Sequence, residues 1–169
     1  MATRGCPCGF LGDRRRACRC SDPQIQRYAG RISGPLRDRI DLVVEVPAIG
    51  SSVRDDGAVG RRESSVTIRS RVVEARECQR ARFGGASQRL NRQLEGGDLS
   101  EHCTLDERSA HLLEAAIQKF CLSARGCDRV LRVSRTIADL AGCRLIAAHH
   151  VAEALQYRFG ESSSYLRHQ

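Results

Sequence analysis

Four cysteines near the start of the chain carry the clearest chemistry in the sequence. They form two C-x-C pairs, Cys6-Pro-Cys8 and Cys18-Arg-Cys20, on either side of an Arg-rich loop that contains Gly9 and Gly12. Four thiolates at this spacing can close a tetrahedral metal site, and zinc is the usual occupant of a structural site of this kind. Structural zinc sites more often use C-x₂₋₄-C, so the alternative is a loop of reduced thiols. The candidate zinc ligands are Cys6, Cys8, Cys18 and Cys20.

The loop between the two cysteine pairs holds the run Arg14-Arg15-Arg16. The chain has a formal net charge of +8, which favours an anionic partner such as nucleic acid or nucleotide phosphate. Lys119 is the only lysine, and this bias reflects a GC-rich genome as much as function. The run therefore has two interpretations, contact with the DNA backbone or a solvated charge run. Phosphate contacts of this kind would be salt-dependent and carry no sequence information.

Composition excludes several other classes of protein. Aromatic residues make up 4% of the chain, too few for a base-stacking platform on single strands. No apolar run approaches the roughly 20 residues that span a bilayer, and the N-terminus has no apolar signal region. The nine cysteines are odd in number and five of them are scattered singly, which fits reduced thiols. We therefore expect a soluble cytoplasmic protein without a membrane partner.

The elements that must position these residues begin after the second cysteine pair. Asp22-Pro23 predicts a helix to about Arg31, and Ser33-Gly-Pro caps a short helical turn through Arg39. The β-branched, apolar segment 41–46 predicts a buried strand, bounded by Pro47. Residues 48–62 have no hydrophobic period and predict a linker.

The rest of the chain predicts helices. One helix begins at Glu63 and is stopped by Gly84-Gly85, with Ile68, Val72 and Ala75 on one face. Three short amphipathic helices follow, beginning at Asp106, Ser123 and about Ala147, and predict a small helical bundle. His149 and His150 open the last helix. Adjacent helical residues point about 100° apart and do not readily share a metal ion, so they are interpreted as cap residues.

Several motifs run in order over nearly the whole chain. They are Cys-Pro-Cys-Gly-Phe-Leu-Gly-Asp13, Cys18-Arg-Cys20, Arg31-Ile-Ser-Gly-Pro-Leu-Arg-Asp-Arg-Ile-Asp41, Val44-Glu-Val-Pro47, Glu63-Ser-Ser, Leu122-Ser-Ala-Arg125, Arg132-Val-Ser-Arg-Thr-Ile-Ala-Asp-Leu-Ala-Gly142 and Ala152-Glu-Ala-Leu-Gln-Tyr-Arg158. In this order they resemble the Mg-chelatase-like AAA+ ATPases of the ComM/YifB type. The resemblance implies a mainly α fold, in which a helical AAA+ lid bundle follows a remnant of the α/β AAA+ core with one or two strands.

The resemblance also implies a division of the chain. Residues 1–47 would be the remnant of the ATPase core with its Cys-rich loop, 48–62 a linker, 63–158 the Mg-chelatase-type lid domain and 159–169 a tail. A P-loop needs G-x-x-x-x-G-K-[ST], but Lys119 lies between Gln118 and Phe120. We therefore expect a chain that begins just inside the ATPase core, through truncation or a misplaced start, and that does not hydrolyse ATP alone.

Two arginines take nucleotide-related roles from the resemblance. Arg39 resembles the arginine finger that reaches the γ-phosphate of a neighbouring subunit. Its alternative is a surface ion pair with Asp38 or Asp41, worth under about 1 kcal/mol. Arg125 resembles the sensor-2 arginine at the start of the lid helix, where an anion is favoured, and its alternative is a solvated helix residue. The later Arg132 and Arg135 are interpreted as structural or weakly phosphate-facing.

The resemblance implies ATP with Mg²⁺ as cofactor of the full-length family member, and DNA, branched or single-stranded, as a partner. It also implies self-association into a hexameric ring that remodels DNA during natural transformation. Two other functions stay open at this point: a non-enzymatic, zinc-stabilised nucleic-acid-binding module, and the motor subunit of a metal chelatase acting on a protein partner.

Overall fold

The computed structural model describes residues 5–13, 15–37, 39–44, 46, 63–85 and 88–159. Its helices are α1 (Asp22–Ala29), α2 (Gly34–Arg37), α3 (Ser65–Arg82), the 3-10 helix η3 (Asn91–Gln93), α4 (Gly97–His102), α5 (Glu107–Phe120), α6 (Ala124–Leu140) and α7 (Ala148–Phe159). The predicted mainly α fold is confirmed. The predicted linker 48–62 and residues 160–169 of the tail lie outside the described residues, and the division into domains stays a prediction.

The helices begin where the sequence predicts them, because side chains cap their first turns. Ser123 accepts a hydrogen bond from the Gly126 N–H at 3.1 Å, and Asp106 accepts one from the Ser109 N–H at 2.7 Å. Such caps satisfy backbone donors that have no partner within the helix. The start of α7 is capped by His150, whose Nδ1 accepts from the Ala147 N–H at 3.0 Å, as the cap interpretation of this residue predicts.

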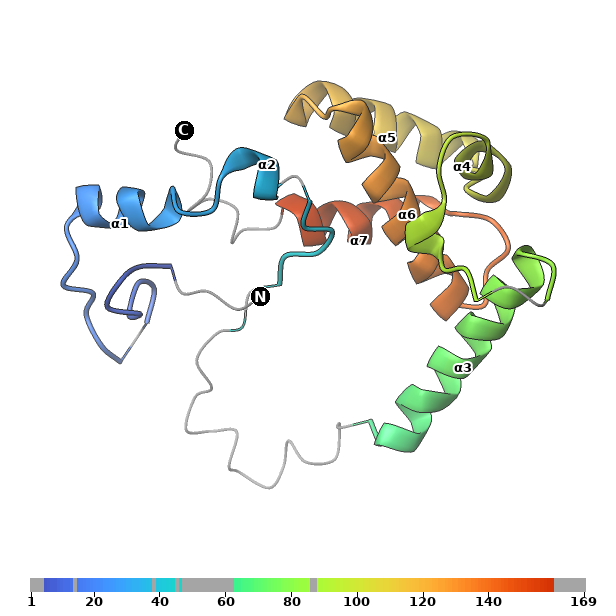
Figure 1. The fold of residues 1–169 in the computed structure, drawn as a ribbon, viewed down its shortest axis with the longest axis horizontal. Coiled ribbons are helices and arrows are strands. Elements are labelled where there is room, and N and C mark those ends of the chain that lie inside the picture. Colours follow the sequence, from blue (N-terminus) through green and yellow to red (C-terminus); the bar gives the residue numbers. More distant parts are fainter. Residues whose placement is uncertain are drawn as a thin grey trace.

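The bundle is organised around α6, which contacts α7, α3, η3 and α4, while α5 packs on α7 (Figure 1). Its buried apolar side chains form one cluster, with members from α4, α5, α6, α7 and the segments between helices: Leu94, Leu99, Cys103, Leu113, Val130, Ala138, Ile146, Val151 and Ala154. The sequence did not predict η3 or α4. Leu94 and Leu99 therefore complete the core from a segment without a predicted element.

A buried polar network fastens α3 and η3 to α6. Asp139 is 3% exposed and accepts hydrogen bonds from Arg82, Asn91 and Arg135. Arg135 also donates to the carbonyls of Cys143 and Arg144, which lie in the loop between α6 and α7. The structural interpretation of Arg135 is therefore confirmed, and no face of this side chain remains for phosphate, since it is 2% exposed.

The predicted buried strand 41–46 is wrong. The described residues of this segment have no regular secondary structure, and Leu42, Val44 and Val46 are 50%, 64% and 85% exposed. A strand needs a neighbouring strand for its backbone hydrogen bonds, and the described residues contain only one isolated bridge, between Leu105 and Ile146. The predicted apolar face of α3 is also only partly buried, because Ala75 is 3% exposed but Ile68 and Val72 are 45% and 43% exposed.

Candidate metal centre

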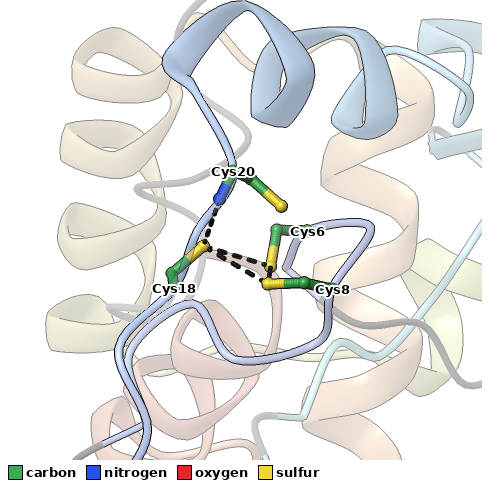
Figure 2. Close-up of side chains that lie close together, drawn as sticks. All are labelled: Cys6, Cys8, Cys18 and Cys20. Carbon is green, nitrogen blue, oxygen red and sulfur yellow. Dashed lines mark hydrogen bonds between the residues drawn. The ribbon is translucent and has the colours of Figure 1, made fainter.

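The four N-terminal cysteines come together at the start of α1 (Figure 2). The sulfurs of Cys6 and Cys8 lie 3.4 Å apart, those of Cys8 and Cys18 lie 3.5 Å apart, and those of Cys18 and Cys6 lie 3.6 Å apart. All four sulfur atoms lie within 4.8 Å of one another, and all nine cysteines of the chain are free thiols. The structure therefore joins the two C-x-C pairs into one cluster of sulfur ligands.

The spacing of the sulfurs fits a tetrahedral metal ion. Zinc binds thiolate sulfur at about 2.3 Å, which places the corners of a regular tetrahedron about 3.8 Å apart. Three of the observed separations lie a few tenths of an ångström below this value, and the fourth sulfur, of Cys20, points toward the other three in Figure 2. The donor set is also of the right type, since four thiolates select zinc or an iron–sulfur centre over the harder cations.

Glycines and short hydrogen bonds fold the loop around this centre. Gly9 has a positive φ of 80° and its N–H donates to the Cys6 carbonyl at 3.1 Å, which closes a tight turn at the first pair. Gly12 has a φ of 79°, a conformation that glycine adopts without steric cost. At the second pair, the Cys20 N–H lies 3.5 Å from the Cys18 sulfur, and Ser21 then caps α1.

The electrostatics of the cluster favour a cation at its centre. Backbone N–H groups of Arg19 and Phe10 donate to Cys8 and lower the pKa of its thiol to about 6. The Cys20 N–H lowers the pKa of Cys18, but desolvation and the contacts with Cys8 and Cys6 together outweigh it and raise that pKa to about 12. The protein alone therefore favours the thiolate form of Cys8 and disfavours the thiolate form of Cys18. A bound dication removes this opposition, because coordinated thiols lose their protons.

Two arginines of the run in the cysteine loop, Arg15 and Arg16, are described by the structure. Arg15 and Arg16 are exposed, and the Arg16 guanidinium stacks over the Phe10 ring at 4.7 Å. The Arg15 N–H donates to the Asp13 carboxylate at 2.7 Å, so this contact uses its backbone rather than its charge. Arg14 lies outside the described residues. The structure thus leaves both described side chains of the predicted DNA-binding run exposed to solvent.

The two arginines with predicted nucleotide roles lie on different elements. Arg39 is exposed in the turn after α2, where its N–H donates to the Leu36 carbonyl at 3.0 Å. Arg125 is exposed in the first turn of α6, two residues after the cap Ser123. The alternative for Arg39, an ion pair with Asp41, is wrong, because Asp41 pairs with Arg129 instead at 3.1 Å. Asp38 lies outside the described residues.

Sequence reasoning missed the pairing of Asp41 with Arg129. Arg129 is 8% exposed and lies beside the apolar Val130 on α6. A buried guanidinium needs a carboxylate or carbonyl partner, so an arginine within an apolar helical stripe was the signal that a partner existed. The pattern gives no information on which acidic residue that partner is.

The fold and this site define a class of protein. Residues 62–158, more than half of the chain, match the family described as magnesium chelatase, subunit ChlI C-terminal, and residues 1–53 match magnesium chelatase, subunit ChlI. The chain belongs to the magnesium-chelatase-like family. The sequence resemblance to ATPases of the ComM/YifB type is thereby confirmed.

Individual relatives agree with this assignment. The chain is 43% identical over 141 residues to the competence protein ComM of Haemophilus influenzae, a match that covers 83% of this chain and 26% of the relative. It is 38% identical over 140 residues to the uncharacterized protein YifB of Salmonella typhimurium, covering 83% of this chain and 27% of the relative. The chain therefore spans about a quarter of the length of these curated relatives.

Among the described residues, no helix combines the length and the apolar character that crossing a membrane requires.

Proposed function

We propose that this chain supplies the arginine finger, the sensor arginine and the lid of an ATP-driven, ring-forming Mg-chelatase-like motor that remodels DNA. One observation carries the proposal: Arg39 and Arg125 are exposed, while four other arginines, on α3 and α6, make internal contacts. These internally bonded residues are Arg82, Arg129, Arg132 and Arg135. Other arginines of the chain are exposed as well, but Arg39 and Arg125 are the two that the family motifs single out for nucleotide-related roles.

Each arginine supplies positive charge at a defined place. Arg39 follows the short helix α2 on an exposed turn, a position from which a guanidinium can extend to a second subunit. Arg125 lies at the N-terminus of α6, where the helix dipole favours an anion. ATP with Mg²⁺ would supply the phosphoryl group that is hydrolysed, and the P-loop that holds it has to come from outside these 169 residues. The chain's own contribution is stabilisation of developing phosphate charge.

The test requires a P-loop, so we define a ring chimera in which this chain replaces the matching quarter of the Haemophilus relative. Arg39→Ala in this chimera is expected to lower the kcat for ATP by about 10³, and Arg125→Ala is expected to weaken nucleotide binding. Arg92→Ala, an exposed arginine of η3, is the matched control. An Arg39→Ala chimera with unchanged kcat would refute the finger role.

We further propose that Cys6, Cys8, Cys18 and Cys20 hold one structural zinc ion. The support is the cluster of four sulfurs, three of whose separations lie within a few tenths of an ångström of those in a tetrahedral zinc site. The ion would link the cysteine loop to the start of α1. Elemental analysis of the purified chain is expected to give one zinc per chain, lost in Cys18→Ser and kept in Cys78→Ser, whose exposed thiol lies outside the cluster. Unmutated protein free of bound metal would end this proposal.

The partner that we propose is DNA, contacted through the exposed side of the cysteine loop at Arg14, Arg15 and Arg16. The support is the net charge of +8 and the solvent exposure of Arg15 and Arg16. Replacing the three arginines by alanine is expected to reduce the slope of log affinity against log salt by up to about 0.9 for each lost contact. Forked DNA bound with the same affinity and salt slope by the triple variant would exclude this surface.

A further inference from the structure

Two contacts join the segment after α2 to the lid bundle of the same chain. The Asp41 carboxylate lies 3.1 Å from Nε of Arg129 on α6, and the Val43 N–H donates to the Tyr157 carbonyl on α7 at 2.8 Å. Figure 1 shows the end of α7 beside the segment that leaves α2. Residues far apart in the sequence therefore meet just after the turn that carries Arg39.

Arg129 differs from the two arginines that follow it on α6. Arg132 donates from Nε to the Leu94 carbonyl at 2.8 Å, and Arg135 belongs to the buried network of Asp139. Arg129 instead faces the segment after α2, and 8% of its surface is exposed, so its ion pair is partly shielded from water. A charge-assisted contact of this kind is stronger than one between fully exposed side chains.

We propose that Asp41 and Arg129, with the Val43–Tyr157 hydrogen bond, form a latch that holds the Arg39 turn against α6 and α7. Asp41 and Arg129 are then positioning residues for Arg39. This inference deepens the proposed function and rests on it for the meaning of Arg39, but the latch itself is a property of this chain.

The chain geometry limits how far Arg39 can move while the latch is closed. Two residues of extended chain span at most about 7 Å, so the Arg39 backbone stays within that distance of Asp41. Arg125 precedes Arg129 by four residues on the same helix, which is about one turn, or about 6 Å, along α6. The same rigid helix thus carries Arg125 at its N-terminus and, about one helical turn further on, Arg129, which holds the segment that contains Arg39. A shift of α6 on nucleotide binding would displace the finger offered to the next subunit.

Amide hydrogen exchange of the full 169-residue chain tests the latch. Asp41→Asn is expected to raise the exchange rate of the Val43 N–H by about tenfold while the α5–α7 amides keep their rates. Asp128→Asn is the matched control, because Asp128 also faces an α6 arginine but lies 3.9 Å from Arg132. Exchange at Val43 that does not change, or that rises equally throughout the bundle, would overturn the latch.

A charge-reversal experiment distinguishes a direct interaction between Asp41 and Arg129 from misfolding caused by a single substitution. Arg129→Asp alone is expected to release Val43 as Asp41→Asn does, and Arg129→Asp combined with Asp41→Arg is expected to restore at least part of its protection. A double variant in which Val43 exchanges as fast as in either single variant would contradict a direct interaction between the two side chains.

The ring chimera separates the latch from the proposed function. Asp41→Asn is expected to lower kcat for ATP about tenfold with little change in KM, and Asp41→Glu to recover part of the loss. If Arg39→Ala lowers kcat but Asp41→Asn does not, the positioning role is overturned. If Arg39→Ala has no effect, the finger role fails and the positioning role fails with it, while the exchange experiment still decides whether the latch exists.

Discussion

Replacing Asp139 by alanine is expected to destabilise the bundle more than any other single loss of charge in it. Asp139 accepts hydrogen bonds from Arg82 at 2.5 and 2.9 Å, from Asn91 at 2.7 Å and from Arg135 at 3.1 Å. The side chains of Arg82 and Arg135 are 13% and 3% exposed, so both would keep a buried charge without its carboxylate. Removing one partner of a buried ion pair costs about 3–5 kcal/mol, a large part of the roughly 5–15 kcal/mol that stabilises a typical domain.

Urea unfolding followed by far-UV circular dichroism measures this loss. The midpoint of unfolding of Asp139→Ala should fall, with the slope unchanged, by an amount equivalent to about 3–5 kcal/mol. Asp128→Ala on the same helix is the control, because its contact with Arg132 is 3.9 Å long and its side chain is 41% exposed. A loss below about 1 kcal/mol in Asp139→Ala would refute the reasoning, because it would show that Arg82 and Arg135 do not depend on this carboxylate.

Two further predictions concern the same bundle. Burial, and to a lesser extent His149, lowers the pKa of His150 below 6.5, so the neutral ring that caps α7 stabilises the fold above pH 6.5 and this contribution is lost as the pH falls below it. Between pH 7.5 and pH 5, the urea midpoint should therefore drop more in the unmutated chain than in His150→Gln. His111→Gln, at an exposed position, is the control and should show the same drop as the unmutated chain. Equal drops in all three proteins would contradict the role of His150. Leu94→Ala, at a fully buried side chain, is expected to cost about 2–5 kcal/mol in the same assay, and Leu145→Ala, 54% exposed, less than about 0.5 kcal/mol; similar losses at both positions would show that Leu94 is not part of the core.

The sequence predicted the helices best where the signal was local. Ser123 and Asp106 were recognised as helix starts, and in the structure their side chains bond to backbone within the same turn. The cysteine cluster was also a local pattern, since each C-x-C pair fixes two ligands by itself. In both cases, residues close in the sequence determine the geometry.

What the sequence could not predict depends on contacts between distant segments. The apolar segment 41–46 has the composition of a strand, but a strand also requires neighbours, and composition does not reveal whether they exist. Likewise, η3 and α4 are short elements whose formation depends on Leu94 and Leu99 packing into the core. The pairs Asp41–Arg129 and Arg82–Asp139 join residues with many possible partners, so only the folded chain identifies them.

The central claim, that Arg39 acts on the nucleotide of a neighbouring subunit, is tested most directly by mixing two inactive ring chimeras. One variant lacks the lysine of the P-loop that the proposed function requires outside this chain and keeps Arg39, and the other keeps that P-loop and carries Arg39→Ala. In randomly mixed rings, about a quarter of the interfaces would pair an intact P-loop with an intact finger. We predict that the equimolar mixture regains about a quarter of the unmutated ATPase rate, whereas a mixture as inactive as either variant alone would contradict the claim.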